Sequence, residues 1–91
     1  MALRWTRSAY ADLQRIHAFL APVDSRVAAR SVRRVVARVR RIPRQPRLGE
    51  RLPSFRNTEV RRVLVDAYEV RYEIVGMDIY VLRIFHTREN R

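Results

Sequence analysis

Residues 60–85 read VRRVLV-DA-YEVRYEIV-GMD-IYVLRIF, a pattern of three strand-like runs separated by two short turns. In the middle run, residues 68–75, aromatic and branched apolar side chains alternate with charged ones, as in a strand buried on one face. The last run, residues 79–85, is apolar at both parities except for Arg83, which predicts an interior strand. The stretch therefore predicts an antiparallel meander.

A short strand and a helix are predicted at the start of the chain. Residues 2–5 alternate briefly between apolar and polar side chains, which indicates a strand. Apolar residues at helical spacing then predict a helix over residues 7–20, which Thr6 or Ser8 can cap and Pro22 stops.

A second, longer helix is predicted from Asp24 or Ser25 to Pro43. Residues 43–58 follow, with three prolines and Gly49, and predict an ordered or mobile loop longer than most connections in compact domains. The apolar stripe of this helix consists of Ala28, Val32, Val35, Val36, Val39 and Ile42.

The predicted elements occur in the order β-α-α-β-β-β. They indicate one α+β domain over residues 1–91, in which a helical hairpin covers one face of a small antiparallel sheet. The other face of the sheet is left for solvent or a partner.

The positive charge of the chain is confined to one segment. All 20 basic residues are arginine, and the net charge is +11. Residues 26–62 contain 13 arginines and two acids, whereas acids and arginines balance elsewhere. Concentrated charge attracts a polyanion or an acidic protein, although the same residues could form only a solvated face. The candidate binding residues are Arg33, Arg34, Arg38, Arg41, Arg44, Arg47, Arg51, Arg61 and Arg62.

Composition excludes several classes of protein. The chain has no cysteine, so we expect neither a disulfide framework nor a thiolate metal site. No second histidine lies at metal-ligand spacing to either His17 or His86, and we expect no metal or cofactor. No apolar run reaches the length of a signal peptide or a membrane span, so we expect a cytoplasmic protein that does not bind membranes.

Four segments carry a pattern that extends over essentially the whole chain. They are Trp5-Thr-x-x-Ala9-x-x-Asp12-Leu13-x-x-Ile16-x-x-Phe19-Leu20, Pro46-x-Leu48-Gly49, Arg61-Arg62-x-Leu64-x-x-x-Tyr68-x-x-x-Tyr72-x-Ile74, and Val81-Leu82-Arg83-Ile84-Phe85-His86-x-Arg88. In this order and spacing the chain resembles RelE/ParE superfamily toxins of type II toxin–antitoxin modules. The resemblance implies a small toxin, neutralised in a hetero-oligomer by a cognate acidic antitoxin encoded beside it.

The resemblance implies one of two activities. ParE-like members inhibit DNA gyrase, whereas RelE-like members cleave mRNA on the ribosome. The pairs Tyr68-x-x-x-Tyr72 and His86-x-Arg88 look more like the ParE side. We therefore expect an inhibitor of DNA gyrase rather than an enzyme. A plain nucleic-acid-binding module that works through its charge alone is a further hypothesis.

An endoribonuclease is the alternative. Its candidate catalytic residues are His86 for proton transfer and Arg62 and Arg83 as phosphate clamps. A structural hydrogen bond from His86 to the loop or to Tyr68 is the competing interpretation of that histidine.

Acidic residues on the middle strand count against a nuclease. RelE-like nucleases usually carry a cation near the position of Glu69. Glu69 and Glu73 share one face of the predicted strand and would repel a phosphate unless Arg71 and Arg83 pair with them.

Overall fold

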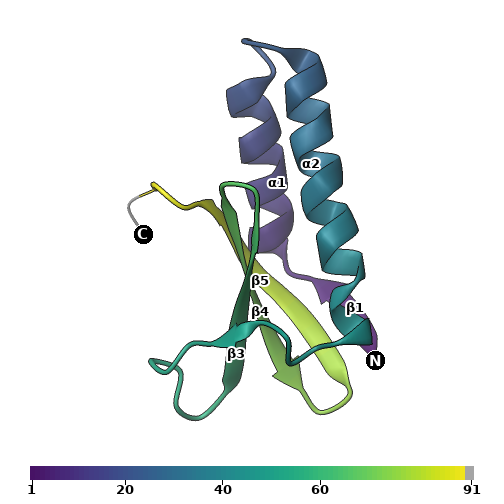
Figure 1. The fold of residues 1–91 in the computed structure, drawn as a ribbon, viewed down its shortest axis with the longest axis vertical. Coiled ribbons are helices and arrows are strands. Elements are labelled where there is room, and N and C mark those ends of the chain that lie inside the picture. Colours follow the sequence, from purple (N-terminus) through teal and green to yellow (C-terminus); the bar gives the residue numbers. More distant parts are fainter. Residues whose placement is uncertain (90–91) are drawn as a thin grey trace.

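The computed structural model describes residues 1–89, and its last third is the predicted meander (Figure 1). β3 (Glu59–Val65), β4 (Tyr68–Val75) and β5 (Asp78–His86) pair antiparallel in sequence order. β4 buries its apolar residues on one face, as its alternating sequence predicts: Val70 and Tyr72 are fully buried on the face turned to the helices.

Two edge strands extend the meander into a five-stranded sheet of order β1-β5-β4-β3-β2. β1 (Ala2–Trp5) pairs with β5 in parallel, with Ala2 opposite Asp78, so the sheet is mixed rather than wholly antiparallel. The chain between these two parallel strands contains both helices and the other three strands, and so gives the long connection that a parallel pairing requires. β2 (Glu50–Arg51), which the sequence did not predict, pairs antiparallel with β3. β5 is interior, as predicted.

α1 (Arg7–Leu20) and α2 (Ser25–Arg40) form the predicted helical hairpin. Thr6 caps α1, and its hydroxyl also donates to the Val81 carbonyl of β5 at 2.7 Å, which ties the start of the helix to the sheet. Asp24 caps α2 by accepting two backbone N–H bonds. The two caps are among those that the sequence predicted.

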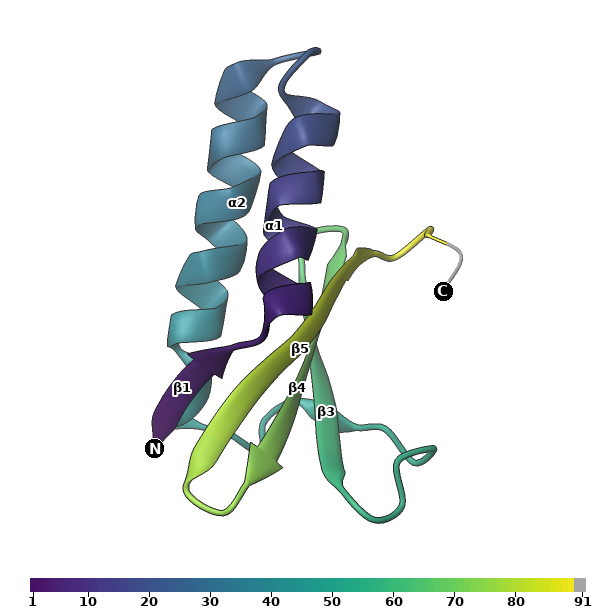
Figure 2. The ribbon, with the colours of Figure 1, turned by 180° about the vertical axis from the view of Figure 1, so that it is seen from behind.

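The helices lie side by side on one face of the sheet, and the tip of their hairpin extends past the end of the strands (Figures 1 and 2). α2 ends at Arg40, three residues before the predicted stop. Pro43 lies instead in a short 3₁₀ turn, η1 (Ile42–Arg44). Within residues 1–89, none of the helices is both long and apolar enough to cross a membrane.

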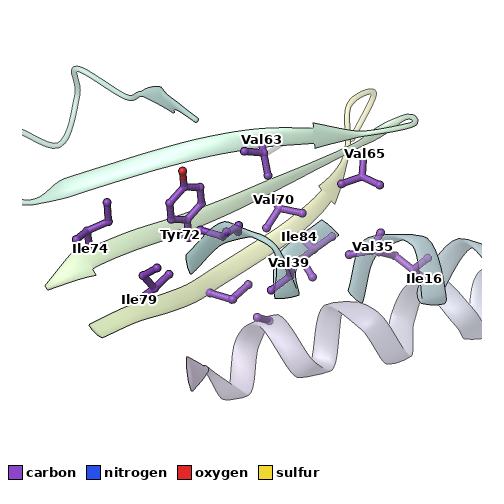
Figure 3. Close-up of a cluster of buried hydrophobic side chains, with 13 residues drawn as sticks. Ile16, Val35, Val39, Val63, Val65, Val70, Tyr72, Ile74, Ile79 and Ile84 are labelled. Carbon is purple, nitrogen blue, oxygen red and sulfur yellow. The ribbon is translucent and has the colours of Figure 1, made fainter. Parts of the chain in front are cut away.

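The core fills the space between the helical hairpin and the sheet (Figure 3). Val35 and Val39 of α2 are fully buried in it, and Tyr72 is the largest side chain there. Valine has modest helix propensity, so this packing, rather than propensity, holds α2. The buried cluster consists of Ala9, Ile16, Val35, Val39, Ile42, Val63, Val65, Val70, Tyr72, Ile74, Ile79, Val81 and Ile84.

The first half of the predicted loop is attached to the sheet. The Tyr72 hydroxyl donates to the Pro46 carbonyl at 2.6 Å, and Arg61 donates to the Gly49 carbonyl at 2.7 Å. Gly49 is buried against Tyr72, so closely that a Cβ there would collide with the tyrosine hydroxyl and approach the Arg62 carbonyl to 2.7 Å. Only glycine allows the chain to pass this close to the core.

We predict that Gly49→Ala destabilises the protein by about 1–3 kcal/mol, because the added methyl group overpacks a site bounded by backbone. Urea unfolding measures the difference. The same substitution in a Tyr72→Phe background should cost less than in the wild type, since one of the two colliding groups is gone. Equal costs in the two backgrounds would show that the tyrosine hydroxyl is not the obstacle.

Candidate functional site

The exposed side of α2 is almost entirely arginine. Val35 and Val39 of the helix face the core, and the opposite side continues into the turn that follows it. A helix whose outer face carries one sign of charge presents a strong local potential. The exposed arginines of this segment are Arg26, Arg30, Arg33, Arg34, Arg40, Arg41 and Arg44.

The candidate binding arginines divide into two groups. Four form ion pairs with acids: Arg34 with Asp66, Arg47 and Arg61 with Glu59, and Arg62 with Glu50 and Glu69. Within residues 1–89, the other five form no ion pair: Arg33, Arg38, Arg41, Arg44 and Arg51. The sequence did not separate the two groups, because most of the acids that hold the first group lie on other elements; only Arg61 has its acid, Glu59, on its own strand.

Three arginines meet at the end of α2. Arg38, Arg41 and Arg44 line an open hollow of about 350 Å³ together with Gln45 and Leu48. The hollow brings free guanidinium groups together, which suits an anionic group, because the planar fork of arginine binds phosphate or carboxylate oxygens in pairs.

A buried carboxylate organises the face of the sheet opposite the helices. Glu69 is 1% exposed, although no helix covers this face (Figures 1 and 2). Arg62 of β3 donates to it at 3.1 Å and Arg71 of β4 at 2.6 Å. Arg62 also donates to Glu50 of β2 at 3.0 Å. The arginines that could bind a phosphate here are thus already bound to carboxylates.

The same network continues across the sheet through an aromatic ring. The guanidinium groups of Arg71 and Arg83 lie 5.2 and 5.0 Å from the centre of the Phe85 ring. Arg83 then donates to Asp12 of α1 at 2.9 Å. Four strands and one helix are therefore linked by alternating ionic and cation–π contacts.

Asp12 forms a hydrogen bond with a backbone group at the edge of β5 that β1 does not reach. Its carboxylate accepts the Ile84 N–H at 2.8 Å, beyond the point where β1 ends, and Arg15 donates to the Ile84 carbonyl at 3.1 Å. Burial alone would raise the pKa of Asp12, but hydrogen bonds from Arg83 and Ile84 outweigh it and lower the pKa below the ordinary value of 3.8. Asp12 therefore stays ionised inside the protein.

The structure does not bring His86 together with Arg62 and Arg83. His86 lies opposite Tyr68 on the helix side of the sheet, with the two rings edge to face at 5.4 Å. Its Nδ1 accepts the Arg88 N–H at 3.1 Å. Arg62 and Arg83 belong to the network on the opposite face. The structural interpretation of His86 therefore fits better, although its hydrogen bond is made with Arg88 in the turn after β5 and its contact with Tyr68 is between rings.

An apolar groove lies beside His86, between the second half of α1 and the end of the chain. It has a volume of about 530 Å³. Sequence reasoning missed it, although Phe19 gave a signal: it falls outside the apolar stripe of α1 and is 79% exposed. Its lining consists of Arg15, Ile16, Phe19, Leu20, Tyr68, His86, Arg88 and Glu89.

The fold closely matches that of a solved toxin–antitoxin protein. A chain from the structure of the chromosomal ParDE toxin–antitoxin system of P. aeruginosa superposes with a TM-score of 0.81 and is 27% identical in sequence. The match covers 94% of this chain and 95% of that chain. No curated protein sequence matches significantly. The structural match and the family match that follows identify a toxin of a type II toxin–antitoxin system.

The family follows from the sequence match. The family model described as the ParE toxin of the type II toxin–antitoxin system parDE matches residues 3–91. The chain belongs to this family, and the resemblance noted in the sequence is confirmed.

Because the folded-state pKa of Asp12 is lowered, its contribution to stability is complete above 3.8 and is lost as the pH falls through the folded value. We predict that Asp12→Asn costs about 1.5–3 kcal/mol at pH 7, the range for hydrogen bonds to a charged group. The variant should also lose less stability than the wild type between pH 7 and pH 3. Urea midpoints at the two pH values measure both effects.

Asp24→Asn is the matched control, because asparagine caps a helix about as well as aspartate does. If the two variants behave alike, the Asp12 carboxylate has no special part in holding β5.

Proposed function

We propose that this ParE-family toxin arrests DNA replication by inhibiting DNA gyrase, and that a cognate acidic antitoxin holds it inactive in a hetero-oligomer. Family membership supports the class of target. One observation supports gyrase inhibition over mRNA cleavage. On the face of the sheet opposite the helices, Glu69 binds Arg62 and Arg71. That face offers paired charges rather than a site for a phosphodiester.

The ribonuclease alternative needs a proton-transfer group and a free cation around one phosphate. Arg62 and Arg83 are each bound to a carboxylate, and His86 lies on the other side of the sheet. Glu69 also stands near the position where RelE-like nucleases usually carry a cation. In our proposal the chain is an inhibitor and not an enzyme.

The antitoxin and the target are proposed to use different kinds of surface. The groove beside Phe19 offers exposed apolar area, which a protein partner needs for its anchoring side chains. Acidic residues of the antitoxin would meet the free arginines Arg38, Arg41 and Arg44 at the end of α2. The short edge strands β1 and β2 also leave room for a segment of the antitoxin to add a strand.

We predict that induction of the toxin alone stops DNA synthesis before protein synthesis. Pulse labelling of both processes in the first minutes after induction measures the order. DNA breaks and an SOS response should accompany the arrest, and His86→Ala should remain toxic. An early halt of translation with cut mRNAs, abolished by His86→Ala, would instead establish the ribonuclease activity.

We predict that Phe19→Asp weakens binding of the neighbouring-gene antitoxin at least 10-fold while toxicity is retained, because the substitution removes an aromatic anchor and places a charge in the apolar groove. Titration calorimetry with the purified antitoxin measures the affinity. Val23→Asp is the matched control: this side chain is 89% exposed at the hairpin tip and does not line the groove. Equal affinities for the two variants would exclude the groove as an antitoxin site.

A further inference from the structure

The arginines of α2 form a straight row along the helix. Arg26, Arg30, Arg33, Arg40 and Arg41 fall within about 100° of the helix circumference, taking roughly 100° per residue. All five are exposed, and Arg44 extends the row into the following turn. We call these six residues the arginine stripe. From Arg26 to Arg41 the stripe is about 22 Å long, at ~1.5 Å per residue.

The charge of the stripe is only weakly offset by its surroundings: Asp66, whose pKa is lowered mainly by its hydrogen bond with Arg34, also interacts with the charge of Arg30. In the part of the chain that the structure describes, none of its six arginines forms an ion pair. The acid next to α2, Asp66, is bound at both oxygens by Arg34, at 2.7 and 2.9 Å. Six cations thus lie close together on one side of the helix. They repel one another unless an external anion binds over them.

Along α2 the stripe lacks the apolar anchors that a protein partner requires, although its last two members, Arg41 and Arg44, also line the hollow proposed above for acidic residues of the antitoxin. Between its arginines the exposed helix surface holds only Ala37, so no large apolar or aromatic side chain can anchor a partner. Exposed apolar side chains lie beside its C-terminal end, where Leu48 lines the hollow with Arg41 and Arg44 and Leu64 lines a second hollow with Arg41, whereas the apolar groove lies beside Phe19. Binding to a polyanion needs only cations at suitable spacing, which is what the stripe supplies.

The stripe also favours double-stranded DNA over other nucleic acids. Single strands are bound through aromatic side chains on which bases stack, and the stripe has none. Duplex RNA is recognised mainly through its 2′-hydroxyl groups and phosphates across a shallow minor groove. A row of about 22 Å matches roughly six base pairs of B-DNA, and the exposed side of one helix fits the edge of its wide major groove.

We propose that the arginine stripe of α2 binds the phosphate backbone of duplex DNA directly and without sequence preference. The stripe would hold the toxin on the DNA on which gyrase works. Only the suggested role, holding the toxin on the DNA on which gyrase works, rests on the proposed function. The test of DNA binding contains no gyrase, so the two proposals can fail separately.

The test is fluorescence anisotropy of a labelled 20-base-pair DNA of arbitrary sequence, titrated with the purified full chain at several salt concentrations. With five to six phosphate contacts, the affinity should fall about 10³-fold between 50 and 200 mM salt. Arg33→Gln/Arg40→Gln should weaken binding at every salt concentration and reduce the slope of log K against log salt by about 2. A shuffled DNA sequence should bind equally well.

Arg7→Gln/Arg56→Gln is the matched control, since it removes the same charge from exposed arginines outside the stripe and outside the groove. If both double variants lose affinity equally, total charge rather than the stripe binds the DNA. If the stripe variant keeps its DNA affinity but loses the antitoxin, the occupant of the stripe is an acidic protein. Tighter binding to duplex RNA than to DNA would likewise overturn the proposal.

Discussion

The interaction on which the rest of the structure depends is the pairing of the Asp12 carboxylate with the edge of β5. β1 covers only the first part of that edge, and beyond it the backbone groups of β5 have no neighbouring strand. Thr6, Asp12 and Arg15 of α1 and its cap provide the missing hydrogen bonds. α1 thus serves as a substitute edge strand, which protects β5 from pairing with other chains. The same bonds set the position of the helical hairpin over the sheet.

Two buried carboxylates bind some of the arginines of this protein, so that only the remaining arginines are available to a partner. Asp12 and Glu69 are both almost fully buried, and each is held by two arginines. These arginines link strands and helix and are not available to a partner. The charge that remains unpaired lies mainly on α2 and the turn after it. The unpaired positive charge therefore acts mainly from the side of α2, while the apolar groove lies beside α1.

The elements of the fold could be predicted from the sequence because each has a local signal. The alternation in β4, the spacing of apolar residues in both helices and the caps Thr6 and Asp24 are such signals. The parallel pairing of β1 and the two-residue β2 were not predicted, because both depend on where distant strands lie. The candidate site was predicted in part. The arginines were found by composition, whereas their acid partners and the groove arise from contacts between residues far apart in sequence.

The pairing of β1 with β5 also decides when during synthesis the fold can form. The first strand lies against residues 78–81, and the carboxylate of α1 binds residue 84, close to the end of the chain. A nascent chain that has only its helices and β3 has neither contact. The apolar faces of α1 and α2 cannot be fully buried until β5 is present. Pairing between strands so far apart in the sequence is intrinsically slow. The helical hairpin therefore cannot take its final position before β5 has been synthesised, and a chain that stops before β5 lacks the strand against which β1 and α1 are placed.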